Sequence, residues 1–162
     1  MDSNGCLPGL DWDPKSTPCL RIASLALSGI LRELCARPAE TGGILLGPRG
    51  RMEVTEFVFD EGGSCSDVTY SPDVVTLKRR LIEEWMPRGL DWKGFAHSHP
   101  GGFDCLSGGD MAYIQRLLRN PNNHDLDFFV APIVIPEEFR LVPYVVQRLR
   151  PHEQRIAELI IT

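Results

Sequence analysis

The fold is decided by a short segment that reads GFAHSHP at residues 94–100. Its small and apolar residues suit a buried strand over 93–99, and Pro100 with the two glycines after it ends that strand. Because side chains alternate between the two faces of a strand, His97 and His99 share one face, roughly 7 Å apart along the chain. One cation can sit between the two imidazoles. The segment therefore predicts a central strand that carries two ligands of a metal site.

Helices and further strands surround this central strand. Apolar residues spaced three and four apart predict helices over 25–36, from the N-cap Ser71 to Gly89, and over 107–119. Short apolar runs between turn residues predict a hairpin of 43–47 with 52–59, a loop over 61–70, and strands over 127–135 and 141–148. The tail, 151–162, has helical spacing, although its last four residues suit a strand equally well. This order favours an α/β (α+β) three-layer sandwich, with a mixed β-sheet flanked by helices.

Length and composition are those of one globular domain. The chain has 162 residues, 43% of them apolar, which suffices for one core over 19–162 after an irregular, proline-bearing leader over 1–18. The net charge of -5 without a basic stripe argues against nucleic acid, and no apolar run is long enough to cross a membrane. No signal peptide is visible, so we expect a cytoplasmic protein.

The five cysteines show no CxxC spacing. An odd, dispersed set argues against a disulfide framework and against a zinc site built from four thiolates. Cys19 and Cys35 lie in apolar stretches, where we expect buried thiols. Candidate metal chemistry therefore rests on histidines and carboxylates.

A third metal ligand is expected at Asp110, in the first turn of the helix that follows the central strand. Asp110 lies one turn before Ile114, so its carboxylate can face the buried side and a metal ion. The alternative is purely structural, because Ser107 at the N-cap with an acid three residues later forms a capping box. Neither the histidine pair nor Asp110 decides between these interpretations alone.

The joint spacing of these residues is more specific than any of them. Glu40 is followed by His97-x-His99, then by seven residues and Ser107-x-x-Asp110, and this order resembles the signature of JAMM (MPN+, or JAB) zinc metalloproteases at every position. The segment ETGGILLG at 40–47 looks like the first catalytic strand of that family. The resemblance covers roughly residues 20–148. The chain looks like a minimal, prokaryotic, deubiquitinase-like member.

The resemblance implies the MPN/JAB (cytidine deaminase-like) fold and a role for each residue. His97, His99 and Asp110 would hold one zinc ion per chain together with a water, Glu40 would be the general base, and Ser107 would stabilise the oxyanion. The implied enzyme is a zinc-dependent isopeptidase or peptidase that cuts after the C-terminal glycine tail of a ubiquitin-like protein, in deconjugation or precursor processing. Its partners would be that substrate and an associated activating and conjugating enzyme system.

Other functions stay open at this point. The same chemistry would serve a protease that processes a sulfur-carrier protein and exposes its terminal glycines. The domain could instead be a non-catalytic MPN scaffold, although scaffolds of the wider fold family usually lack the metal ligands that this chain keeps. A nucleoside-deaminase-like zinc enzyme is disfavoured, because its HxE and PCxxC pattern is absent.

The loop between the expected ligands departs from the family pattern. Cys105 and Leu106 precede Ser107, whereas many relatives have a proline directly before the serine. A Cys105 thiolate could approach the metal and displace its water, but an ordinary loop cysteine is the simpler interpretation. Residues 62–70 are the one segment that could serve as a short version of the insertions with which eukaryotic relatives grip ubiquitin.

Overall fold

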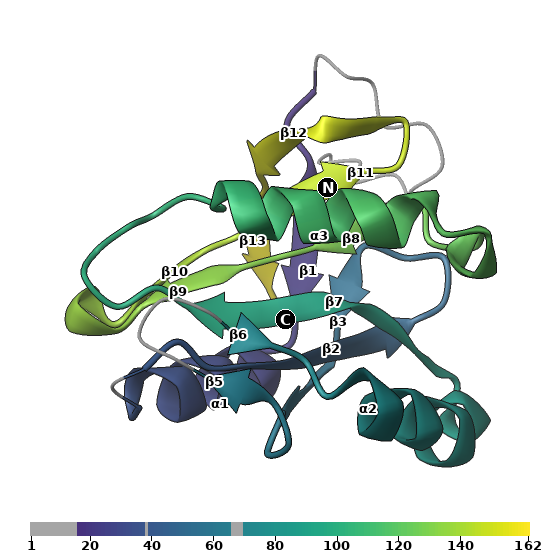
Figure 1. The fold of residues 1–162 in the computed structure, drawn as a ribbon, viewed down its shortest axis with the longest axis horizontal. Coiled ribbons are helices and arrows are strands. Elements are labelled where there is room, and N and C mark those ends of the chain that lie inside the picture. The colour runs from purple at the N-terminus through teal and green to yellow at the C-terminus, as the bar shows by residue number, and fades with distance from the viewer. Residues whose placement is uncertain (1–15, 38, 66–69) are drawn as a thin grey trace, which may run out of the picture.

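A computed structural model describes residues 16–37, 39–65 and 70–162 of the chain. The described part is an α+β structure in which a mixed sheet carries helices on both faces, as the sequence predicts (Figure 1). Most of the expected leader, residues 1–15, lies outside the described residues. No helix of the described part is both long and apolar enough to span a membrane.

Three α-helices and four shorter helical turns are described, and the α-helices lie where the sequence predicts helices. They are α1 (Ser24–Cys35), α2 (Val74–Arg80) and α3 (Gly108–Arg119). A π-helical turn, η1 (Leu81–Trp85), and a 3-10 turn, η2 (Met86–Arg88), continue α2 as far as Gly89. The other 3-10 turns are η3 (Pro121–Asn123) and η4 (Pro136–Glu138).

The main sheet is built around β7 (Leu90–Ser98). One side of β7 pairs antiparallel with β2 (Gly42–Pro48), and the other side pairs parallel with β8 (Phe128–Val130) and β9 (Ile133–Ile135). The sheet is completed by β4 (Glu56–Phe59), β10 (Arg140–Val142), β11 (Tyr144–Gln147) and β12 (Arg150–Ile156). The strand that carries His97 and leads directly into His99 is therefore central, as predicted.

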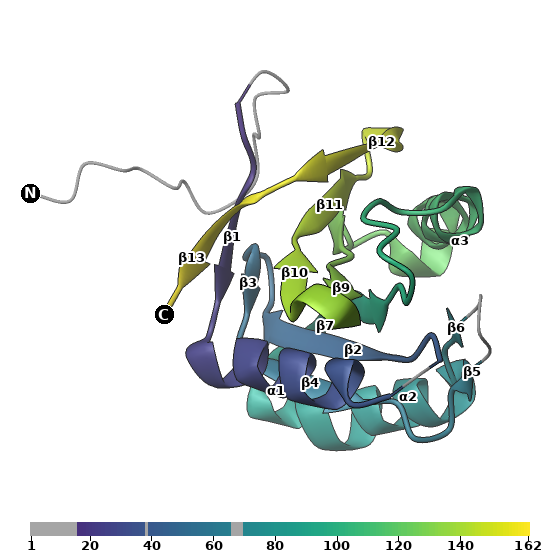
Figure 2. The ribbon, with the colours of Figure 1, turned by 90° about the vertical axis from the view of Figure 1, so that its left-hand side faces the viewer.

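Two apolar clusters hold the helices on opposite faces of this sheet (Figure 2). On one face, Ile30 and Leu34 of α1 pack with Leu45 and Ala96 of the sheet. On the other face, Ile114 of α3 joins the cluster that includes the α2 and η1 residues Leu77 and Trp85. The three layers thus follow from the alternation of side chains along β2 and β7.

The C-terminal tail corrects the helical alternative for residues 151–162. It forms β12 and β13 (Glu158–Ile161), and β13 pairs in parallel with β1 (Cys19–Ile22), with Leu159 opposite Leu20. A short β3 (Glu53–Val54) pairs with the other side of β1 (Figure 2). Backbone pairing of β12 with β11 and of β13 with β1 overrides the helical spacing.

Further expectations need correction. The segments 127–135 and 141–148 are each two strands rather than one, because Pro132 between β8 and β9 and Pro143 between β10 and β11 have no N–H to donate to the ladder. The expected hairpin strand 52–59 is likewise divided into β3, which pairs with β1, and β4, which pairs with β2. The second helix is capped by Asp73 rather than Ser71, since the Asp73 side chain accepts a hydrogen bond from the Thr76 N–H at 3.2 Å. Ser71 instead belongs to β6 (Tyr70–Ser71), which pairs with β5 (Ser64–Cys65) in the segment expected to be a loop.

The cysteines also differ from expectation. Cys19 forms a disulfide bond, so the expectation of a buried thiol is wrong for this residue. Cys35 is a free, partly buried thiol that packs against the α1 side of the core, and Cys65 and Cys105 are free as well.

Candidate metal centre

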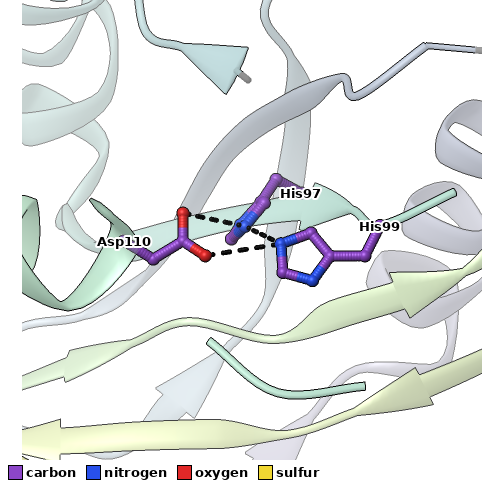
Figure 3. Close-up of side chains that lie close together, drawn as sticks. All are labelled: His97, His99 and Asp110. Carbon is purple, nitrogen blue, oxygen red and sulfur yellow. Dashed lines mark hydrogen bonds and ion pairs between the residues drawn. The ribbon is translucent and has the colours of Figure 1, made fainter. Parts of the chain in front are cut away.

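The structure brings His97, His99 and Asp110 together at one end of the central strand (Figure 3). His97 lies on β7, His99 directly follows it, and Asp110 lies in the first turn of α3. One ligand atom from each of the three residues lies within 4.8 Å of the others. Both imidazoles are buried, and the carboxylate is partly buried. Residues separated by a loop in sequence thus form one cluster.

The distances in the cluster suit a small divalent cation. The Asp110 carboxylate oxygens lie 3.3 Å from His97 Nε2 and 3.3 Å from His99 Nε2, and the two Nε2 atoms lie 2.9 Å apart. Ligands held at about 2.0–2.1 Å in a tetrahedron around zinc are about 3.3 Å from one another. Two imidazoles and one carboxylate leave a fourth position open, as in catalytic zinc sites. The donor set therefore fits zinc.

A backbone carbonyl orients His99. His99 Nδ1 lies 3.0 Å from the Phe103 carbonyl oxygen, which can only accept a hydrogen bond. Nδ1 therefore carries a proton, so Nε2 is the nitrogen that faces Asp110 and His97: it donates to Asp110 when the ring is protonated and offers its lone pair to a metal when the ring is neutral. Metal-binding histidines commonly use such a partner to fix their tautomer and ring orientation. The sequence gives no sign of this contact.

Asp110 is held by the same capping box that the sequence offered as a structural alternative. The Ser107 hydroxyl accepts a hydrogen bond from the Asp110 N–H at 3.1 Å, and the Asp110 carboxylate accepts one from the Ser107 N–H at 2.8 Å. The box starts α3 and at the same time aims the carboxylate at the histidines. Both interpretations of the Ser107–Asp110 spacing are therefore compatible.

The protonation of the cluster reflects burial and close opposite charges. Burial raises the pKa of Asp110, but hydrogen bonds from His97 and His99 outweigh it and hold the pKa well below its usual range. Burial likewise lowers the pKa of His99, and the hydrogen bond and charge of Asp110 more than compensate, so the pKa is raised. Asp110 is therefore ionised, and its negative charge attracts a proton or a metal cation to the space between the His97 and His99 imidazoles.

Glu40 lies beside the cluster without joining it. Glu40 Oε1 is 4.0 Å from His99 Nε2. Burial raises the pKa of Glu40, and the nearby His99 and His97 oppose that rise. A carboxylate in this position can accept a proton from a water bound near the histidines. The position fits the general base that the family resemblance implies.

Backbone pairing explains why Glu40 lies beside the metal cluster although it precedes His97 by 57 residues in the sequence. The β2–β7 register places Gly42 opposite His97. Just before β2, Thr41 is fixed to Ser98, because the Thr41 N–H donates to Ser98 Oγ at 3.1 Å and the Ser98 N–H donates to the Thr41 carbonyl at 2.9 Å. The buried serine between the two histidines therefore positions the segment that carries Glu40.

The loop between the ligands is anchored from three other elements. The Tyr144 hydroxyl of β11 donates to the Asp104 carbonyl at 2.8 Å. The Gln154 side chain of β12 accepts from the Leu106 N–H at 2.9 Å and donates to the Leu106 carbonyl at 3.2 Å. Glu137 Oε1 accepts from the Gly101 N–H at 2.7 Å.

Cys105 does not share this site. Among the described residues, the potential metal-binding cluster consists of His97, His99 and Asp110 alone. The Cys105 side chain is partly buried and packs against the core cluster of α2 and α3. The structure therefore favours the interpretation of an ordinary loop cysteine.

Similarity to known proteins agrees with this geometry. The sequence profile of the prokaryotic homologs of the JAB domain matches residues 23–153. A protein of Desulfitobacterium hafniense, known from a solution structure, has a TM-score of 0.66 and 18% identity, over 88% of this chain and 92% of that one. A JAB1/MPN domain protein of Archaeoglobus fulgidus has a TM-score of 0.50 and 16% identity, over 89% of this chain and 98% of that one. Among curated protein sequences, none matches the chain.

Proposed function

The chain belongs to the family of prokaryotic homologs of the JAB domain, and from this premise we propose that it is a zinc-dependent peptidase or isopeptidase. The observation that carries the proposal is the convergence of His97, His99 and Asp110, with Glu40 Oε1 4.0 Å from His99. A scaffold does not need two buried imidazoles that face a carboxylate, because apolar side chains would pack at this place without the cost of burying polar groups.

Each residue has a distinct task in this proposal. His97, His99 and Asp110 hold zinc, which supplies an acidified water and polarises the scissile carbonyl when it is bound. Glu40 accepts the proton of the attacking water at a carboxylate oxygen and passes it to the departing amine. The Ser107 hydroxyl stabilises the negative charge that develops on the carbonyl oxygen.

A cavity of about 40 Å³ lies beside the ligands and is lined by residues that include Tyr70, Phe95, His97, Asp110 and Tyr113. We propose the glycine-ending tail of a ubiquitin-like protein as the substrate, the class that the family implies, with β5–β6 as an edge beside which an extended tail can pair.

Processing of a sulfur-carrier protein remains the second candidate, since its tail also ends in glycines. The two candidates differ in the partner rather than in the chemistry. Fusions of a ubiquitin-like protein and of a sulfur-carrier protein, each followed by a peptide after the terminal glycines, separate them by their relative kcat/KM.

The activity itself is tested with the zinc-loaded protein and Glu40→Gln. We expect the parent protein to cleave the substrate and a chelator to abolish this cleavage. For Glu40→Gln we expect kcat to fall about 100-fold or more while zinc stays bound. Equal cleavage by both proteins would remove Glu40 from the mechanism. Failure to bind about one zinc ion per chain, or zinc binding without any hydrolysis, would favour the scaffold alternative.

A further inference from the structure

A buried carboxylate lies outside the metal cluster, just after β4. Asp60 is 4% exposed, and its Oδ2 accepts hydrogen bonds from the Tyr70 hydroxyl at 2.9 Å and from the Asp73 N–H at 2.9 Å. The Asp60 N–H donates to the Gly42 carbonyl at 3.0 Å. Asp60 thereby links β6, the N-terminus of α2 and the start of β2.

Tyr70, which Asp60 holds, contacts the candidate metal centre in two ways. Its ring stacks on the His97 imidazole, with the centroids 6.4 Å apart and the planes at 24°. A backbone hydrogen bond from Tyr70 is also among the influences that lower the pKa of Glu40, against the rise that burial causes. The ring occupies the space beside Gly42, two residues after Glu40, where an added Cβ would come within 2.4 Å of Tyr70 Cε1. One residue therefore lies against a metal ligand and against the start of the strand that follows the general base.

Core packing alone does not account for this arrangement. A phenylalanine would fill the same volume and would need no buried carboxylate as a partner. Burial of a charged group rarely adds net stability compared with an apolar replacement, whereas it can select one geometry. The hydroxyl of Tyr70 is therefore best understood as a device that fixes where its ring and backbone lie.

We propose that Tyr70 is a positioning residue: held by Asp60, it fixes the Glu40 carboxylate against the histidine pair. Glu40 precedes β2 and lies in a segment without regular secondary structure, so backbone pairing alone does not fix its side chain. The β5–β6 pairing places Tyr70 opposite Cys65, and the orientation of Glu40 thereby depends on this hairpin. The inference rests on the proposed function only for the statement that Glu40 acts as the base.

Two variants remove the link and two serve as controls. Tyr70→Phe keeps the ring but loses the hydrogen bond to Asp60, and Asp60→Ala removes the acceptor. Asp60→Asn keeps an oxygen that can accept both hydrogen bonds and is the conservative rescue. Asp125→Ala removes an exposed acid that pairs with Arg49 away from the site.

The first measurement is the crystal structure of each zinc-loaded protein. We expect the Glu40 carboxylate to leave its position near His99, 4.0 Å away here, in Tyr70→Phe and Asp60→Ala and to keep it in the two controls. This comparison needs no substrate, so it decides the inference even if no peptidase activity is found. Glu40 at the same place in all four variants would overturn the inference.

The second measurement is the split between kcat and KM. We expect kcat to fall about tenfold or more in Tyr70→Phe, with KM changed less than about twofold, because small displacements of a catalytic group are costly. Asp60→Ala should show a similar fall in kcat, and Asp60→Asn should retain most of the kcat that Asp60→Ala loses. A higher KM with unchanged kcat would contradict the inference and make Tyr70 a substrate contact. If Asp60→Ala does not fold, Tyr70→Phe still decides the outcome, since its ring preserves the packing.

Discussion

Replacement of Ser107 by alanine separates the two roles that this residue can have. The change removes the hydroxyl that accepts from the Asp110 N–H at 3.1 Å and leaves the 2.8 Å hydrogen bond from the backbone N–H of residue 107 to the Asp110 carboxylate. Loss of an N-cap side chain costs about 1 kcal/mol of stability. For a chain of 162 residues, that cost lowers Tm by about 2–4 °C.

A chemical role for the hydroxyl predicts a much larger effect on the reaction. Removal of one donor to an oxyanion typically lowers kcat by about 10²–10³, or roughly 3–4 kcal/mol in the activation barrier. This is about three times the cost of the lost cap, so the two roles differ measurably. Thermal unfolding of the metal-free protein reports the first role, and kcat of the zinc-saturated protein reports the second.

The N-cap of η3, which directly follows α3, provides the matched control. The Asn120 side chain accepts a hydrogen bond from the Asn122 N–H at 2.9 Å, so Asn120→Ala also removes one cap. We expect a small loss of Tm and no change in kcat for this variant. If Ser107→Ala likewise loses stability while kcat falls less than about tenfold, Ser107 only caps the helix and the oxyanion role is refuted.

Three further predictions concern the support of the site and of the sheet. Gln154→Met, which loses both hydrogen bonds to Leu106, should weaken zinc binding about tenfold in a chelator competition; unchanged affinity would show that the loop needs no such anchor. Gly94→Ala should lower the free energy of unfolding by roughly 3 kcal/mol or more, because its φ is 151° and a Cβ would lie 1.9 Å from the Val130 carbonyl oxygen. A urea unfolding midpoint equal to that of the parent protein would contradict the close contact of β7 with β8 at this glycine. The pKa of Asp110 in the folded protein lies below the ordinary aspartate value of about 3.9, so the stability that its ionised form contributes is present above about pH 4 and is lost as the pH falls toward the folded pKa. Between pH 5 and 3, Asp110→Asn should therefore lose less stability than the parent protein, and equal losses would argue against the ionised cluster.

Local patterns predicted the elements that carry the ligands. The central strand and α3 follow from residues that are close in sequence: a buried apolar run that ends at Pro100, and a helix that starts at Ser107. The tail could not be predicted in the same way. β12 pairs with the neighbouring β11, but β13 depends on pairing with β1, more than 130 residues earlier, and such long-range pairing leaves no periodic signal in either segment.

The same division holds within the site. The spacing of Glu40, His97, His99 and Asp110 predicted residues that the structure does bring together. The groups that orient them were not predictable, because the Phe103 carbonyl and the Tyr70 N–H belong to the backbone, which every residue type supplies. Side-chain chemistry can be found in a sequence, whereas the partners of that chemistry depend on how the loops fold.

The capping box shows why a structural and a functional interpretation of one motif need not compete. Asp110 Oδ2 accepts from the Ser107 N–H and lies 3.3 Å from His99 Nε2. The hydrogen bond of the capping box thus holds the carboxylate beside the histidine pair, where a metal ligand is needed. The helix start that stabilises α3 therefore also positions the ligand, and Ser107→Ala acts on the fold and on the metal site through the same lost hydrogen bond from the Asp110 N–H to the Ser107 hydroxyl.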